Sequence, residues 1–321
     1  NPKEIIWNNS IIVTAIFEEQ SPFYLDENGV TIKARDWVTA GTTGELDGVT
    51  YTAVDIDKLK LMFTKEEDVS KVVTTLITDM SDLFENAPIE ERAYQTWLVE
   101  FNPDISSWDV SNVTNMSNMV GGAWREFHFN QDISKWDVSK VTNMSGMFNN
   151  AFLFNQDIGE WDVSQVADMS LLFGTDQYQY TSNFNQDIGS WDVSKVTNMS
   201  LMFSNSLFNQ DIGGWDVSNV TNMSSMFKDA EAFNKDIGSW DVSEVTNMGW
   251  LFKEATAFNQ DIGDWDVTNV TIMGYMFHIA QLFNQDLTRW CVLNIPEEPD
   301  AFSISSALTE TNKPIWGTCP D

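Results

Sequence analysis

Two aspartates recur at fixed places in a unit of about 25 residues, of which FNQDIGSWDVSKVTNMSLMF at 184–203 is one copy. The first aspartate column consists of Asp104, Asp132, Asp157, Asp187, Asp211, Asp236, Asp261 and Asp286. The second column consists of Asp109, Asp137, Asp162, Asp192, Asp216, Asp241 and Asp266. Carboxylates repeated in this way could bind cations, could act as a catalytic acid–base pair, or could accept hydrogen bonds from backbone N–H groups in turns.

The spacing favours the structural role. If copies stack about 4.8 Å apart, neighbouring carboxylates repel by roughly 1 kcal/mol in water and about 3.5 kcal/mol at an effective dielectric constant of 20. Hydrogen bonds from turn N–H groups compensate for this repulsion and favour the ionised form. Calcium between the copies is the alternative, and its weak candidates are Asp187, Asp211, Asp236 and Asp261. Because Ca²⁺ takes six to eight oxygens and the unit lacks a dense DxDxDG or GGxGxD motif, we assign no metal and no cofactor and keep calcium as an open alternative.

Signatures of catalysis are scarce in this sequence. The chain has two histidines, His128 and His278, and contains no HExxH, CxxC, GxSxG or phosphate-binding glycine loop. Paired aspartates could serve a glycosidase, but catalysis needs two environments that push the pKa values apart, and here the carboxylates repeat in every copy. We therefore predict that the protein is not an enzyme.

A phenylalanine opens each copy of the unit. These residues are Phe101, Phe129, Phe154, Phe184, Phe208, Phe233, Phe258 and Phe283, at spacings of 28, 25, 30, 24, 25, 25 and 25. One copy is too small to bury its own Phe, Ile, Trp, Val and Met side chains, so neighbouring copies must stack and share a core. The tryptophans of successive copies then form a column, which we interpret as a core ladder and not as a ligand platform.

The expected fold is a leucine-rich-repeat-like solenoid of about eight coils. The stretch DIGSWDV predicts one short parallel β-strand per coil, and the spacing of apolar residues in VTNMSLMF predicts a helical or 3₁₀ turn. The asparagines of VTNM are expected to satisfy backbone groups in a tight bend.

The repeat becomes irregular toward both ends of the chain, which divides the sequence into four regions. Residues 1–50, with the run IIVTAIF and the turn signals DENG and LDGV, are expected to form a β-rich leader or linker. Residues 51–100 are expected to form an N-terminal cap, with a helix in DIDKLKLMF and a degenerate repeat in LITDMSDLF. The solenoid is predicted to occupy 101–290 and a C-terminal cap 291–321, because a solenoid end must cover its core.

The two cysteines, Cys291 and Cys319, lie 28 positions apart and flank the last segment. An isolated pair placed in this way fits a disulfide that pins the C-terminal cap in an oxidising compartment. The alternative is a pair of buried thiols in a cytosolic protein.

Three insertions interrupt the regular spacing at the same point of the coil. A regular coil takes six positions from its last Phe to the next opening Phe, whereas Phe84–Phe101 takes seventeen, Val120–Phe129 nine and Phe173–Phe184 eleven. Such loops emerge along one edge of a solenoid and often bind partners. The candidate ligand-binding residues on them are Tyr94, Trp97, Trp124, Arg125, His128, Tyr178 and Tyr180. The alternative is that the loops cover the cap or a gap in the core.

The net charge of −31 indicates which kinds of molecule the protein could bind. Nucleic acid and anionic membrane surfaces are poor partners on Coulombic grounds, whereas cations and basic surfaces are better ones. No run of 18 apolar residues could span a membrane, and the first residues lack the pattern of a signal peptide, so an exported protein would appear here in mature or trimmed form.

The motif FNQDIxxWDVSxVTNMSxMF, the lead-in DENGVTIKA with LDGVTYTAVD, and the ending NKPIWGTCP resemble the BspA-like leucine-rich-repeat surface proteins, over roughly residues 28–321. The repeat of that family also occurs in Mycoplasma-type lipoproteins and Bacteroidetes surface proteins. The resemblance implies a bacterial protein that is secreted or displayed at the cell surface, with members implicated in adhesion. No catalytic residues come with it. Asp168 and Ile272 depart from the motif, since they replace the VTNM asparagine.

The leading hypothesis is therefore a non-enzymatic, extracellular repeat protein that mediates adhesion by binding a protein or a glycan, possible partners including another surface protein of the same cell. No nucleic acid partner and no direct membrane insertion are expected. The alternative is a structural spacer or stalk module of a larger surface protein, stabilised by cations where the aspartate columns bind them.

Overall fold

The computed structural model describes residues 20–65, 67–84, 102–121, 128–175 and 180–320, together with the backbone of two strands nearer the N-terminus. These strands, β1 (Lys3–Trp7) and β2 (Ile11–Ala15), pair in an antiparallel hairpin. The strand predicted in IIVTAIF is thus present as β2.

A small β-module precedes the repeats. Strands β3 (Phe23–Leu25) and β4 (Ile32–Ala34) pair antiparallel, and so do β5 (Thr43–Leu46) and β6 (Val49–Ala53). Asp47 and Gly48, which connect β5 to β6, have φ of 50° and 78°, as a type I′ hairpin turn requires. The hairpin runs through residue 50, the expected boundary between leader and cap. Strand β7 (Val72–Val73) pairs parallel to β6 and joins the module to the chain that follows.

The helix α1 (Ile56–Thr64) covers the first coils, as the predicted helix in DIDKLKLMF should. It begins at Asp55, whose carboxylate accepts a hydrogen bond of 2.8 Å from the N–H of Lys58. Leu59 and Phe63 on its inner face are buried in the main core. A bare solenoid end exposes its core, and α1 closes this end.

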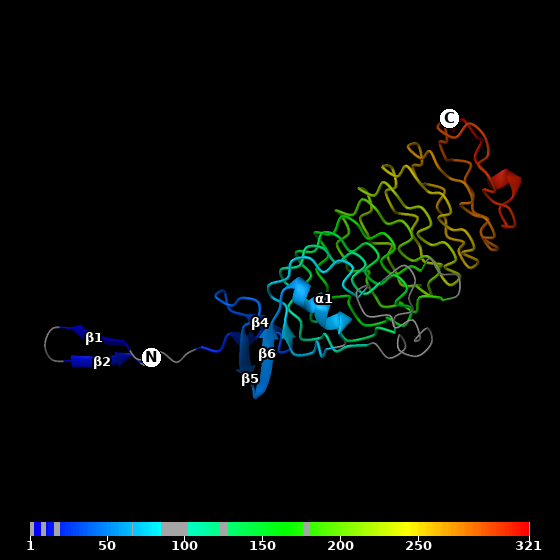
Figure 1. The fold of residues 1–321 in the computed structure, drawn as a ribbon. Helices are drawn as coiled ribbons and strands as arrows, with labels where there is room; N and C mark the ends of the chain where they lie inside the picture. Colours follow the sequence, from blue (N-terminus) through cyan, green and yellow to red (C-terminus); the bar gives the residue numbers. More distant parts are fainter. Residues whose placement is uncertain are drawn as a thin grey trace.

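The repeats form an elongated stack of coils that runs from the β-module to the C-terminus (Figure 1). Backbone N–H groups donate along the stack. Those of Met199, Leu201 and Phe203 reach carbonyls of the next coil at 2.9–3.0 Å. Parallel bridges link equivalent positions of successive coils, namely Asp79, Asn115, Asn143, Asp168, Asn198, Asn222, Asn247 and Ile272. Like residues therefore lie in columns. The assignment of this stack to the leucine-rich-repeat-like class stays a prediction.

The expected strand in DIGSWDV is wrong, because the described copies of this stretch bend in a turn. In one copy the N–H of Trp191 donates to Ile188 O at 3.1 Å, and Asp187 Oδ1 accepts the N–H of Gly189 at 3.0 Å. The helical turn expected in VTNMSLMF is replaced by successive β-turns, since Leu201 has a φ of 60°. Asx-turn chemistry thus prevails over the apolar pattern from which strand and helix were inferred.

A single hydrophobic core runs through the stack from Val54 to Leu308. The tryptophan column lies inside it, with each side chain at most 4% exposed. Each indole N–H of the column donates to a backbone carbonyl at 3.0–3.3 Å, as from Trp215 to Ile188 in the coil before. The rings of Phe203 and Phe208 stack at a centroid distance of 4.0 Å. The tryptophans are therefore core residues that also tie coil to coil.

Members of both aspartate columns close turns. In the second column, Asp192 Oδ1 accepts the hydroxyl of Ser194 at 2.6 Å and its N–H at 3.1 Å, and these two bonds hold the pKa of Asp192 below its ordinary range. Asp241 has a lowered pKa for the same reason. Asp109 differs from its column, being 1% exposed, whereas the others are exposed.

The C-terminal segment, which contains the 3₁₀ helix η2 (Glu310–Asn312), is joined to the last full repeat by a disulfide between Cys291 and Cys319. The predicted pairing is confirmed. The main-chain N–H of Val292 also donates to Thr318 O at 2.9 Å, so the segment is held by backbone contacts as well.

Removing a core ring should destabilise the whole stack. Phe227 is fully buried and stacks on Phe233 and on Phe252, so we expect Phe227→Ala to lower the free energy of unfolding by about 3–5 kcal/mol in urea denaturation. The control Leu282→Ala, at a side chain 59% exposed, should change it by no more than about 0.5 kcal/mol. Equal losses in the two variants would contradict a shared core.

Acid should weaken the aspartate turns. A carboxyl whose folded pKa lies below the ordinary 3.8 stabilises the fold above that value and loses this contribution as the pH falls through the folded pKa. We therefore expect the melting temperature to fall as the pH is lowered below about 4. In an NMR titration, Ser194→Ala should raise the pKa of Asp192. A wild-type pKa of Asp192 at or above 3.8 would rule out the proposed turn contribution.

Candidate functional site

The structure describes two of the seven expected ligand-binding residues. His128 and Tyr180 are half-buried. The other five, Tyr94, Trp97, Trp124, Arg125 and Tyr178, lie outside the described residues. The described part of this edge is therefore the part that surrounds His128 and Tyr180.

These two residues are brought together by Phe152, which the sequence analysis did not single out. His128 meets the Phe152 ring edge to face at a centroid distance of 5.2 Å, and Phe152 stacks on Tyr180 at 5.1 Å with an interplanar angle of 17°. We call these three side chains the aromatic row. A signal was present in the sequence: Phe152 lies two positions before an opening Phe, where later copies have Ser, Glu, Thr or Gln.

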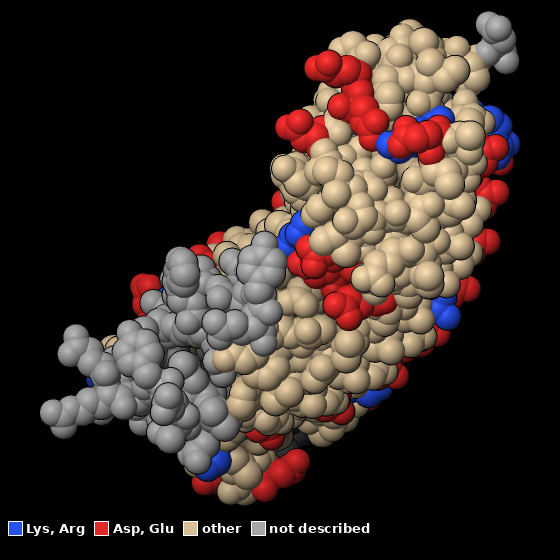
Figure 2. Space-filling model, turned by 90° about the vertical axis from the view of Figure 1, so that its right-hand side faces the viewer, with Lys and Arg blue, Asp and Glu red and all other residues tan. Residues whose placement is uncertain are grey.

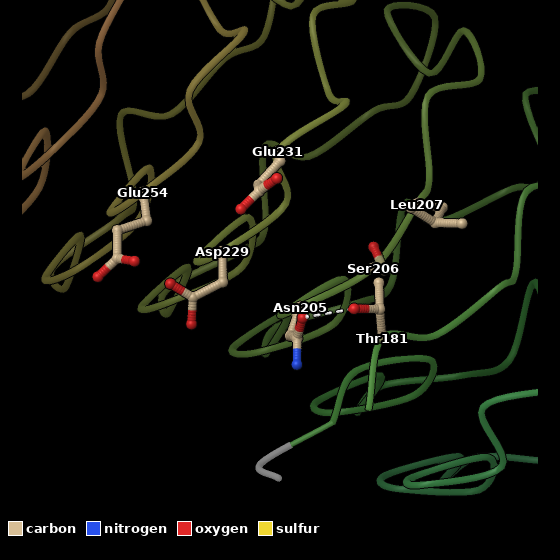
Figure 3. A pocket seen from close by; sticks show the side chains of 7 residues that line it. All are labelled: Thr181, Asn205, Ser206, Leu207, Asp229, Glu231 and Glu254. Atoms are coloured by element: carbon tan, nitrogen blue, oxygen red, sulfur yellow. Dashed lines mark hydrogen bonds between the residues drawn. The ribbon is translucent and has the colours of Figure 1, made fainter. Parts of the chain in front are cut away.

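A pocket of about 240 Å³ begins where the aromatic row ends. It is lined by Thr181, Asn205, Ser206, Leu207, Asp229, Glu231 and Glu254, and we call it the acidic pocket (Figure 3). Asn205 Nδ2 donates to Tyr180 O at 2.8 Å, and Thr181 Oγ1 donates to Asn205 Oδ1 at 3.2 Å. The row and the pocket are thus parts of one surface.

The charge of the pocket is partly neutralised by lysines that precede its acidic residues. Lys228 Nζ lies 2.8 Å from an Asp229 carboxylate oxygen, and Lys253 Nζ lies 2.6 Å from Glu254 Oε1. Both lysine side chains are only 17% exposed, so their charges face their partners more than the solvent. Figure 2 shows one side of the molecule, where acidic side chains gather in separate patches between wide uncharged areas.

The four weak calcium candidates each take part in a local turn. Asp187, Asp211, Asp236 and Asp261 accept a hydrogen bond from the glycine N–H two residues on, at 2.9–3.0 Å. Among the described residues, no group of three or more His, Cys, Asp or Glu side chains could hold a metal ion. This geometry supports the hydrogen-bonded role, and the metal and cofactor assignments stay predictions.

The two histidines lie in coils that are six repeats apart, which at about 4.8 Å per coil places them about 29 Å from each other along the stack. His278 packs against Tyr275 in an edge-to-face contact at a centroid distance of 5.6 Å, and its main-chain carbonyl accepts a hydrogen bond of 2.8 Å from the N–H of Glu254. In the described part of the chain, no helix has the length and apolar character needed to cross a membrane.

Comparison with known proteins gives one match. A family model described as "Mycoplasma protein of unknown function, DUF285" matches residues 54–179, 175–249 and 206–314. These overlapping matches extend from the start of the cap through all the coils and into the C-terminal segment. Curated proteins and solved structures gave no match. Because the matches together span well over half of the chain, it belongs to this Mycoplasma family of repeat-containing proteins, DUF285.

Proposed function

We propose that this protein is a non-enzymatic, BspA-like surface or secreted repeat protein that mediates adhesion by binding a protein or a glycan. The proposed binding surface is the loop edge, which contains the aromatic row and the acidic pocket and to which the sequence assigns the three insertions. The observation that carries the proposal is the continuity between the row and the pocket, which meet at Tyr180 and Asn205.

The chemistry of this edge suits recognition better than catalysis. Aromatic side chains that remain half-exposed offer large, rigid contact area and are enriched at the energetic centres of protein interfaces. The adjacent carboxylates, amide and hydroxyls of the pocket can fix the orientation of a ligand through hydrogen bonds. An adhesive contact needs both features and needs no tuned acid–base pair.

One feature of the chain supports an extracellular location, and another bears on the partner. The disulfide between Cys291 and Cys319 is typical of an oxidising compartment. The net charge of −31 favours basic partner surfaces, and disfavours nucleic acid and anionic membranes. The membership of a Mycoplasma repeat family agrees with a bacterial origin for the repeat.

A spacer or stalk module is the second candidate, and the continuous core favours it. One cluster of buried side chains joins the cap helix to the C-terminal segment without a break among the described coils. Such a stack is rigid along its length and could hold another domain away from a surface. A spacer needs no ligand, so binding measurements separate the two candidates.

Loss of the aromatic row should weaken adhesion without unfolding the protein. The wild type and Tyr180→Ala would be compared on an array of glycans and matrix proteins. We expect the variant to bind its target at least about fivefold more weakly, and its free energy of unfolding to change by no more than about 1 kcal/mol. Trp97→Ala and Trp124→Ala should have the same effect. Binding that is unchanged in all three variants would rule out the loop edge as the binding surface, and binding that is absent in the wild type would favour the spacer.

Removal of calcium should leave the stack intact, because the candidate aspartates are already hydrogen-bonded in turns. We expect 5 mM EDTA, a convenient excess of roughly mM chelator over the weak sites of extracellular modules, to leave the melting temperature unchanged. A drop of many degrees that added calcium reverses would show that cations stabilise the aspartate columns.

A further inference from the structure

A second surface with recognition chemistry consists of residues that belong neither to the aromatic row nor to the lining of the acidic pocket. Trp250 is 40% exposed, and its ring stacks on Tyr275 of the next coil at a centroid distance of 5.6 Å and an interplanar angle of 9°. Both residues occupy the variable position of VTNMSxMF. This column consists of Asp82, Asn118, Gly146, Leu171, Leu201, Ser225, Trp250, Tyr275 and Ala301.

The backbone at these positions does not call for aromatic side chains. Every member of the column has a positive φ, and the values at Trp250 and Tyr275 are 58° and 60°. Bulky side chains are disfavoured in this region, whereas Asn and Gly, which occur at Asn118 and Gly146, are suited to it. The conformation of the turn therefore does not explain why Trp250 and Tyr275 occur at these positions.

Trp250 has an aromatic neighbour in the column on one side only. The N–H of Ser225 donates to Gly249 O at 2.9 Å and that of Trp250 to Gly274 O at 2.9 Å, which keeps the column in register along the stack. Tyr275 covers the face of the indole that looks toward the C-terminal end. On the other side the neighbour is Ser225, whose short side chain cannot cover an indole, and Leu201 follows two coils away, at about 10 Å. On the Ser225 side, the column therefore has no flat side chain that could stack on Trp250.

We propose that the sugar ring of an uncharged glycan stacks on the Ser225 side of the Trp250 ring. We call Trp250, Tyr275 and Ser225 the Trp250 platform. A pyranose ring presents a face of C–H groups to an aromatic ring and directs its hydroxyls sideways, where they can bond to Ser225 Oγ and to polar groups of the same turn. The glycan is uncharged because the strongly acidic protein repels acidic polysaccharides.

An aromatic side chain of a partner protein fits this platform less well. Side chains that dominate protein interfaces insert into closed pockets from which water is excluded. Trp250 stands instead on an open corner, flanked by a side chain that leaves its ring accessible. A sugar retains hydrogen bonds to water on its outer side, so an open platform suits it.

This inference rests on the proposed function in that it assumes a binding protein, but its residues differ from those of the aromatic row.

The test is affinity gel electrophoresis of the full chain through gels that contain mannan, β-1,3-glucan, galactan or, as an acidic polysaccharide, alginate. The variants are Trp250→Ala, Trp250→Phe, Ser225→Leu and, as the loop-edge control, Tyr180→Ala. Leu201 occupies the same turn position with a φ of 60°, which shows that the coil accepts the leucine of Ser225→Leu.

We expect at least one uncharged polysaccharide to retard the wild type and alginate not to do so. Trp250→Ala should weaken the retardation about tenfold, Trp250→Phe less than about threefold, and Ser225→Leu should weaken it by covering the ring. Tyr180→Ala should behave as the wild type here even if it loses the target of the loop edge. The inference is overturned if no uncharged polysaccharide retards the protein, or if Trp250→Ala binds as well as the wild type.

Discussion

The register between successive coils is the constraint on which the rest of this structure depends. It is set by main-chain hydrogen bonds along the stack, by the bridges at the VTNM asparagine, and by the indole N–H bonds of the tryptophan column. Once it is set, every repeat position becomes a column. Apolar columns then form one core, and polar columns face the solvent with their turns already closed by aspartate and serine.

Much of this organisation could be predicted from the period alone. The burial of the tryptophans, the helix that covers the first coil and the disulfide at the other end followed from spacing and composition, because each depends on patterns that repeat or visibly stop repeating. The conformation of DIGSWDV was predicted wrongly, as a strand. The apolar residues Ile and Trp suggested an extended chain, whereas the aspartate before them folds that stretch into a turn.

The candidate binding surfaces were harder to predict, since they arise where a column is broken. Phe152 links His128 to Tyr180 only because copies of unequal length are brought side by side. The exposure of Trp250 depends on the serine one coil earlier, 25 positions away in the sequence. In a stack with uniform columns, departures from the repeat carry the specific information, whether they are inserted loops or single residues. The aspartate columns, by contrast, repeat in every copy and accept hydrogen bonds within the turns.

Native-state hydrogen exchange followed by NMR tests the register most directly. The amides of Met199, Leu201 and Phe203 donate to the next coil, so they should exchange slowly, as should the equivalent amides of Met223, Ser225 and Phe227. Protection should match from coil to coil. Fast exchange at these positions in the folded protein, or protection confined to one or two coils, would contradict a stack held in register along its length.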